Sequence, residues 1–169
     1  MASTYEKIAS TTLGSDTATV TFSAISGSYT DLVLVLMTRC TGAQNSAGMD
    51  LLCTVNSDSG SNYSQTNLTG NGSAASSNRN TNATSFFLGS TSNKSTNDWP
   101  IVRASFNNYS NTTTYKSVLI RQDTSESYTV AKAGLWRSTS AITSLSFTVE
   151  SSLSFKSGST FTLYGILKA

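Results

Sequence analysis

The sequence predicts an all-β protein, a two-sheet antiparallel β-sandwich of jelly-roll-like type in a single domain over residues 1–169. Three observations lead to this prediction. Apolar residues alternate with polar ones in runs of strand length. Serine and threonine fill most of the polar positions within these runs. Turn residues separate one run from the next, and the single proline of the chain does not interrupt the runs. About ten short strands of this kind pair into two packed sheets, a common way of protecting strand edges in an all-β domain.

Most of the expected strands show one apolar face. The clearest alternation runs through Ala18–Phe22, Met49–Val55, Val102–Phe106 and Leu145–Val149, as in strands with one buried face. Leu32–Met37 is apolar at every position, so we expect it to be covered on both faces or to lie centrally in its sheet. Five further strands complete the set: Tyr5–Ala9, Ser85–Leu88, Tyr115–Gln122, Tyr128–Trp136 and Thr160–Leu167.

Two segments lie outside this pattern. We expect a short N-terminal arm at residues 1–7 and a long polar loop at residues 56–85. Loops of this length are usually functional or disordered. Because Tyr63 and Leu68 are the only large apolar residues in it, the loop is expected to lie against a partner, ordered in an assembly and mobile in the isolated chain.

The charge pattern excludes several kinds of partner. Charged residues make up 12% of the chain, about half the usual share of roughly 25%. The net charge is +2, and the basic residues form no cluster, which argues against nucleic acid as a partner. The N-terminus lacks the apolar core of an export signal, and no apolar run approaches the roughly 18 residues of a membrane span. We therefore expect no membrane partner, and synthesis in a host cytoplasm.

The two cysteines, Cys40 and Cys53, are expected to be buried free thiols. If the runs that contain them form a hairpin across residues 41–48, Cys40 faces Met49 and Cys53 faces Leu36. The two cysteines would then lie about four residues, or about 13 Å, apart along the strands. A disulfide needs Cα atoms within about 7 Å of each other, and a reducing compartment favours thiols.

Enzymatic chemistry is not expected. The chain has no histidine, which removes Ser-His-Asp and Cys-His catalysis and most zinc sites. The closest acidic pair, Asp123 and Glu126, is flanked by serines between two strands and is interpreted as part of a solvated turn. The stretch Asp58–Asn62 resembles a calcium loop only faintly, because a glycine takes its third place, and an Asp-Gly turn is favoured. No catalytic residue, cofactor or metal ion is predicted.

Several residues are candidates for contact with a partner. Tyr63, Trp99 and Tyr109 lie in or beside polar sequence, where an exposed ring can anchor in a neighbouring subunit or stack on a sugar. The alternative is that each ring covers an end of the core. Tyr63 is expected to anchor the loop to the partner. Arg79 is the only charged residue between Ser59 and Lys94. The complete set of predicted interaction residues is Tyr5, Tyr63, Asn67, Arg79, Trp99 and Tyr109.

Several strings in the chain resemble small virion structural proteins of tailed bacteriophages: "DLVLVL", "DSGSNYSQTNLTGNGSAASS", "NNYSNTTTYKSVL", "AGLWRSTSAITSLSF" and "GSTFTLYGI". The resemblance runs from about residue 4 to the C-terminus. It implies a jelly-roll-like capsid decoration (cement) protein on the virion surface, a homotrimer that binds the major capsid protein and stabilises the assembled shell. The alternative is a tail-fibre or receptor-binding module that recognises host surface glycans. The resemblance offers no catalytic residues to carry over.

Overall fold

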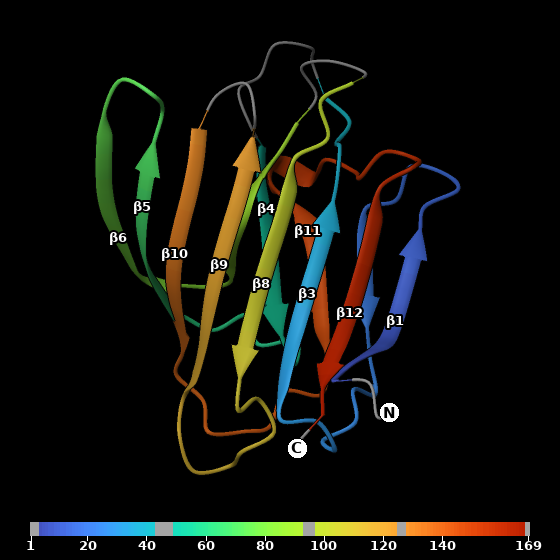
Figure 1. Ribbon diagram of the computed structural model, residues 1–169, viewed down its shortest axis with the longest axis vertical. Coiled ribbons are helices and arrows are strands. Elements are labelled where there is room, and N and C mark those ends of the chain that lie inside the picture. The colour runs from blue at the N-terminus through green and yellow to red at the C-terminus, as the bar shows by residue number, and fades with distance from the viewer. Residues whose placement is uncertain (1–3, 43–48, 93–96, 125–127, 168–169) are drawn as a thin grey trace.

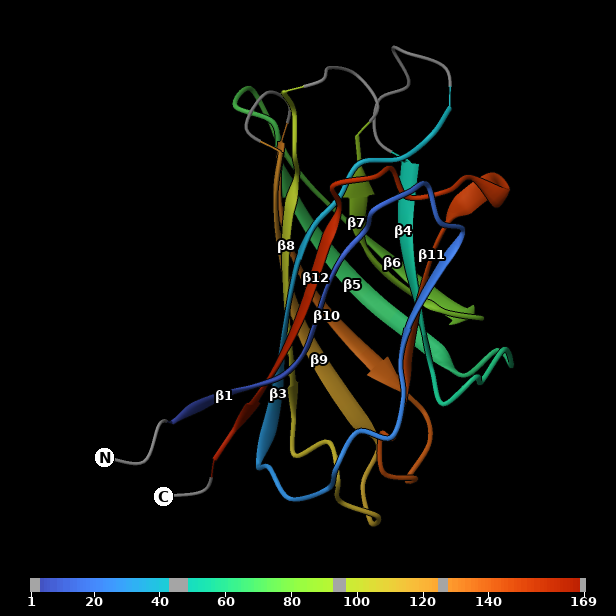
Figure 2. The same ribbon diagram turned by 90° about the vertical axis from the view of Figure 1, so that its right-hand side faces the viewer.

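The computed structural model describes residues 4–42, 49–92, 97–124 and 128–167, and it confirms the prediction of an all-β sandwich. The strands of these residues form two antiparallel sheets that pack face to face (Figure 1, Figure 2). Among the described residues, the one helical element is the 3₁₀ turn Glu150–Ser152.

The larger sheet has eight strands. Figure 1 shows it face on, with β6 at one edge and β1 at the other. Its inner face packs on the smaller sheet, and we call the opposite side the outer face. In spatial order the strands are β1 (Tyr5–Thr12), β12 (Thr160–Ile166), β3 (Asp31–Met37), β8 (Ile101–Asn107), β9 (Lys116–Thr124), β10 (Tyr128–Trp136), β5 (Tyr63–Gly70) and β6 (Ala75–Ala83).

The smaller sheet has four strands and lies behind the larger one in Figure 1. In Figure 2 the hairpin of β5 and β6 curves towards the side of the smaller sheet. Without this hairpin and the hairpin of β9 and β10, each of the two sheets would have four strands. The two hairpins therefore add four strands to one edge of the larger sheet. The strands of the smaller sheet are, in spatial order, β2 (Thr19–Phe22), β11 (Leu145–Val149), β4 (Met49–Val55) and β7 (Phe86–Thr91).

The core lies between the two sheets and follows from the alternation in the sequence. On β8, for example, Val102, Ala104 and Phe106 are all buried, whereas the residues between them are more exposed. Across the core, the rings of Phe147 and Phe161 lie 5.7 Å apart. Aromatic pairs of this kind contribute roughly 0.5–1.5 kcal/mol beyond the burial of their surface.

The apolar strand β3 lies inside the larger sheet, as predicted. Leu34 faces the core and is fully buried. On the outer face, Val33 lies opposite Tyr164 of β12 and Ser105 of β8, and only 5% of it is exposed. Neighbouring strands on both sides therefore account for the continuous apolar run.

The prediction of a long polar loop at residues 56–85 is wrong. Most of this segment forms β5 and β6, and β5 pairs with β10 from Tyr63 opposite Trp136 to Gly70 opposite Thr129. The inward positions of β5 include the polar residues Gln65 and Asn67. The segment therefore lacks the apolar alternation by which the other strands were identified.

A short turn joins β5 to β6. The Oδ1 atom of Asn71 accepts hydrogen bonds from the backbone N–H groups of Ser73 and Ala74, at 3.0 and 2.8 Å. Gly72 has a φ of +85°, a conformation that glycine adopts without a steric penalty. These contacts close the hairpin within its own chain.

Two further expectations need correction. The N-terminal arm at residues 1–7 is not separate where it is described, because β1 begins at Tyr5 and pairs with β12; residues 1–3 lie outside the described residues. The hairpin expected around the cysteines does not form, because β3 and β4 belong to different sheets. Cys40 and Cys53 are nevertheless buried free thiols, as predicted, and burial raises the pKa of both.

Candidate functional site

Tyr63, the predicted loop anchor, is a core residue. Its side chain is 0% exposed, and its ring packs edge to face on Phe86 with centroids 4.9 Å apart. Its hydroxyl donates to the carbonyl oxygen of Asp58 at 2.8 Å and accepts from the N–H of Val55 at 3.0 Å. The expectation that Tyr63 reaches a partner is therefore wrong.

The Asp58–Asn62 stretch is a turn, as the sequence favoured. The Asp58 carboxylate accepts hydrogen bonds from the Gly60 N–H at 2.8 Å, from Asn62 Nδ2 at 2.9 Å and from Trp136 Nε1 at 2.6 Å. Burial alone would raise the pKa of Asp58, but the bonds from Trp136, Asn62 and Gly60 outweigh it and lower the pKa. The carboxylate joins this turn to the end of β10.

The acidic residues that the sequence singled out for catalysis can be placed only in part. Asp123 is exposed near the end of β9, and Glu126 lies outside the described residues. Within the part of the chain that is described, no three side chains of His, Cys, Asp or Glu come together as metal ligands would. In the same ranges, no helix has the length and apolar character needed to cross a bilayer.

Two more predicted residues are buried. Tyr109 is 0% exposed, and its hydroxyl donates to the carbonyl oxygen of Ser26. Asn67 is also buried, and its Nδ2 donates to Oδ1 of Asn78 at 2.6 Å. The expectation of an exposed ring at Tyr109 is therefore wrong, and Asn67 faces the interior side of the larger sheet.

The other three predicted residues are more accessible. Trp99 is half-buried, and the Arg39 guanidinium lies over its ring, 5.3 Å from the ring centroid. Arg79 is exposed on the edge strand β6, and Tyr5 is 47% exposed on β1. The six residues do not form a single site.

The outer face of the larger sheet carries a group that the sequence did not identify. Four large apolar side chains are exposed on it: Tyr5 on β1, Leu68 on β5, Ile101 on β8 and Leu119 on β9, with exposed fractions between 47% and 57%. Tyr115, which directly precedes β9, is 54% exposed. These five are all the exposed large hydrophobic residues among those described.

Strand register brings part of this group together. On β10, Ala131 lies opposite Leu68 of β5, and Ala133 lies opposite Leu119 of β9. All four residues are exposed, so an apolar surface crosses three neighbouring strands. Exposed contiguous apolar patches on soluble proteins mark interaction sites.

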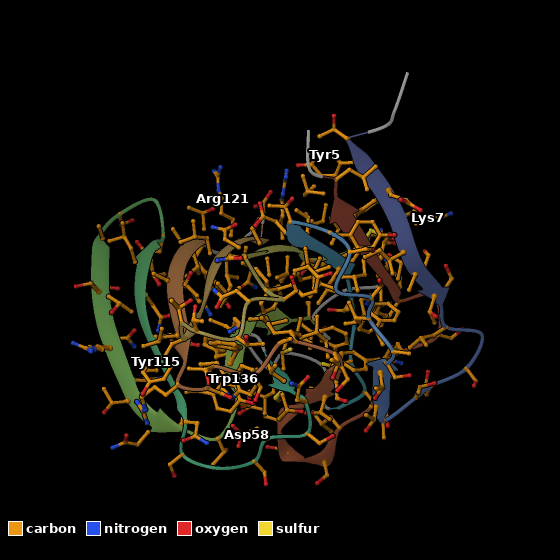
Figure 3. The ribbon with its side chains drawn as sticks, turned by 90° about the horizontal axis from the view of Figure 1, so that it is seen from below. Tyr5, Lys7, Asp58, Tyr115, Arg121 and Trp136 are labelled. Carbon is orange, nitrogen blue, oxygen red and sulfur yellow. The ribbon has the colours of Figure 1, made fainter. Side chains whose placement is uncertain are left out.

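Two arginines lie on the same face. Arg103 of β8 is directly opposite Arg121 of β9, a placement of like charges that destabilises a sheet by itself. The Arg103 Nη2 donates to the hydroxyl of Tyr5 at 3.1 Å. The exposed Arg121 makes no side-chain hydrogen bond to any other described residue, and Figure 3 shows it on the same side of the molecule as Tyr5, away from Asp58.

Beside the two arginines the surface is hollowed over about 350 Å³, with Ile101, Asp123 and Thr129 in its lining. Arginine and aromatic residues are enriched in protein interfaces, whereas lysine and acidic residues are depleted. On the outer face, the exposed residues Tyr5, Leu68, Ile101, Arg103, Leu119, Arg121, Ala131 and Ala133 therefore combine the apolar, aromatic and arginine side chains that are typical of protein-binding surfaces.

The chain matches no protein-family model, and no curated protein matches it. Its function is therefore inferred from the outer face and from the sequence resemblance.

Proposed function

We propose that this protein is a non-enzymatic structural protein of a tailed-phage virion that binds the assembled capsid through its outer face. The observation that carries the proposal is the apolar surface around Leu68 and Leu119 with two adjacent arginines. Arginine is enriched among the few residues that supply most of the binding energy in protein interfaces. The sequence resemblance supports the major capsid protein as the partner.

The strand connections support a jelly-roll fold as part of this proposal. With the hairpins β5–β6 and β9–β10 set aside, the order β1-β12-β3-β8 faces the order β2-β11-β4-β7. Two four-stranded sheets linked in this way correspond to the eight-stranded jelly roll, an architecture that recurs in viral capsid proteins and lectins.

The low charge of the chain suits attachment in many copies. A surface rich in hydroxyl groups and poor in charges, 12% in this chain, can pack against another protein without the desolvation penalty of buried ions. Weak contacts repeated over a shell gain strength through multivalency. A protein that binds only the assembled shell also stabilises it by mass action.

Self-association into a homotrimer belongs to the same proposal. The edge strand β6 is exposed along nearly its whole length and pairs, among the described residues, with β5 alone. Unpaired strand edges are templates for pairing with another chain. Native mass spectrometry should then give about 53 kDa, three times the 17.8 kDa chain, and a monomer in the presence of capsids would contradict the trimer.

The alternative is a tail-fibre or receptor-binding module that recognises host glycans by stacking aromatic rings on sugars. Tyr63 and Tyr109 are both 0% exposed, so two of the three rings that this role would use cannot contact a sugar. The decoration role is therefore preferred.

A sedimentation experiment tests the proposal. Purified protein is mixed with capsids that lack it, and the bound fraction is measured after pelleting. The variant L119D removes an apolar side chain from this surface and should reduce binding at least tenfold, because the complex loses the burial of Leu119 and must also remove a charged group from water. The control T19D changes an exposed residue of β2 on the other sheet and should bind normally.

Two outcomes would contradict the proposal. Wild-type protein that fails to bind capsids would exclude the decoration role. Binding of L119D at wild-type strength, with both variants folded, would exclude the outer face as the attachment surface.

A further inference from the structure

A polar cavity of about 180 Å³ lies on the inner face of the larger sheet, apart from the outer face. It lies where the sheet extends beyond β7, an edge strand of the smaller sheet. Exposed Asn78 and half-buried Thr69 and Tyr128 form its accessible side. The remaining lining residues are Asn67, Phe87, Ser90, Gln122, Val130 and Lys132.

Lys132 brings a cation into this cavity. The residue is only 4% exposed, and its Nζ lies 3.1 Å from the centroid of the Phe87 ring and donates to the Phe87 carbonyl oxygen at 3.2 Å. An ammonium group has three N–H donors, and no other described residue accepts from this one. The buried Lys116, by contrast, donates to two carbonyl oxygens, at 2.7 and 3.1 Å.

Gln122 brings an acceptor without a partner. Its Nε2 donates to the carbonyl oxygen of Ser90 at 2.8 Å, but its buried Oε1 has no hydrogen-bond partner among the described residues. A side chain at Gly89 would place its Cβ 2.5 Å from this Oε1, so the glycine makes room for the amide. Buried polar atoms in native proteins are nearly always paired with a protein group or an ordered water molecule, so this oxygen needs a donor from outside the chain.

We propose that this cavity binds a small organic carboxylate that carries a neighbouring hydroxyl group, of which a hexuronic acid is the representative. The carboxylate accepts from an N–H group of Lys132 that faces neither the carbonyl nor the ring of Phe87, and the hydroxyl donates to Oε1 of Gln122. The Phe87 ring and Val130 offer apolar contact to the ring of the ligand. The volume is below the roughly 300 Å³ of the smaller drug-sized sites, so one sugar unit fits better than a longer chain.

The inference does not depend on capsid binding, because the cavity and the outer face lie on opposite sides of the same sheet. A hexuronate can arrive as a free sugar acid or as the end unit of a glycan. Titration with D-glucuronate and with a disaccharide ending in glucuronate distinguishes the two sources. Binding of both indicates a glycan end, and binding of the free acid alone indicates a small metabolite; either result upholds the proposed chemistry.

The test follows amide chemical shifts in a titration of the full chain. D-Glucuronate should bind at least tenfold more tightly than D-glucose, which lacks the carboxylate, and than acetate, which lacks the hydroxyl groups. K132M should reduce glucuronate affinity at least tenfold, whereas K7M, which changes an exposed lysine of β1, should leave it unchanged. Q122L should lower the affinity without affecting acetate.

The pH dependence adds an independent readout. Burial lowers the pKa of Lys132 to about 7, although Asp50 partly opposes this effect. The other titratable groups around it are Asp50 of β4, whose carboxyl lies near Glu150, and Tyr128 of its own strand. Because the ligand binds the ammonium form, affinity should fall by up to tenfold per pH unit above about pH 7, and K132M should abolish this dependence.

Three results would overturn the inference. One is equal binding of glucose and glucuronate by the wild-type protein. Another is unchanged glucuronate affinity in K132M. The third is a crystal structure, grown with glucuronate, in which only ordered water pairs with Gln122 Oε1.

Discussion

Replacement of Tyr63 by alanine should destabilise the whole fold. The ring is 0% exposed and packs on Phe86, and removal of a buried aromatic side chain typically costs about 3–5 kcal/mol. The variant Y63F keeps the ring but leaves the N–H of Val55 and the carbonyl of Asp58 without the hydroxyl, which costs about 1–3 kcal/mol. Domains of this kind are stable by about 5–15 kcal/mol in total, so Y63A should lose a large part of the unfolding free energy.

Urea unfolding with linear extrapolation measures these free energies. The matched control is Y5A, because Tyr5 is 47% exposed on the outer face, and surface substitutions usually change stability by less than about 0.5 kcal/mol. The expected order of stability is wild type and Y5A, then Y63F, then Y63A. Equal stability of Y63A and Y5A would refute the placement of Tyr63, and with it the hairpin, in the core.

Three further substitutions test other parts of the fold. G134A would place a Cβ 2.8 Å from the Phe86 ring, so overpacking should lower the unfolding free energy by about 1–3 kcal/mol; an unchanged urea midpoint would contradict this packing. K132M should raise stability at pH 7 by about 1–4 kcal/mol, because it removes a buried charge. The pKa of Lys132, about 7, lies below the usual lysine value of about 10.4. The stability of the wild type should therefore rise with pH between these two values, and the stability advantage of K132M should shrink. A stability advantage of K132M that does not vary with pH would contradict the burial of the cation. D58A removes the acceptor of the Trp136 indole N–H. Because the pKa of Asp58 is lowered, its stabilising contribution in the wild type is present above about pH 4 and lost as the pH falls further; acid unfolding curves that coincide for wild type and D58A would contradict this role.

Most strands could be predicted because each buries one face. The alternation of Val102–Phe106 predicts β8, and the bounds of β10, Tyr128–Trp136, agree with the sequence-based range. The same physical rule explains β3, whose continuous apolar run reflects neighbours on both sides. Periodicity therefore predicts strands wherever apolar side chains form the buried row.

The hairpin of β5 and β6 was missed because its buried row is polar. Gln65 and Asn67 point inward and hydrogen-bond to each other and to neighbouring groups, so no apolar period marks the strand. The one local signal was Asn71-Gly72, since Asn-Gly pairs favour tight hairpin turns. Pairing with β10 then determines the register, which composition alone does not reveal.

The candidate surfaces could not be predicted for a different reason. Leu119 lies between Val118 and Ile120, so the run reads as buried although Leu119 points outward. Leu68 and Leu119 come near each other only because β10 pairs with both of their strands. The polar cavity likewise gathers residues from five strands, so both surfaces depend on long-range pairing.

The number of copies per virion tests the proposed function most directly. Quantitative mass spectrometry of purified virions, with the major capsid protein as the internal standard, measures it. A capsid decoration protein should be present in on the order of hundreds of copies, since its weak contacts repeat over the shell. About a dozen copies, as expected for a tail fibre, or none at all, would contradict the proposal.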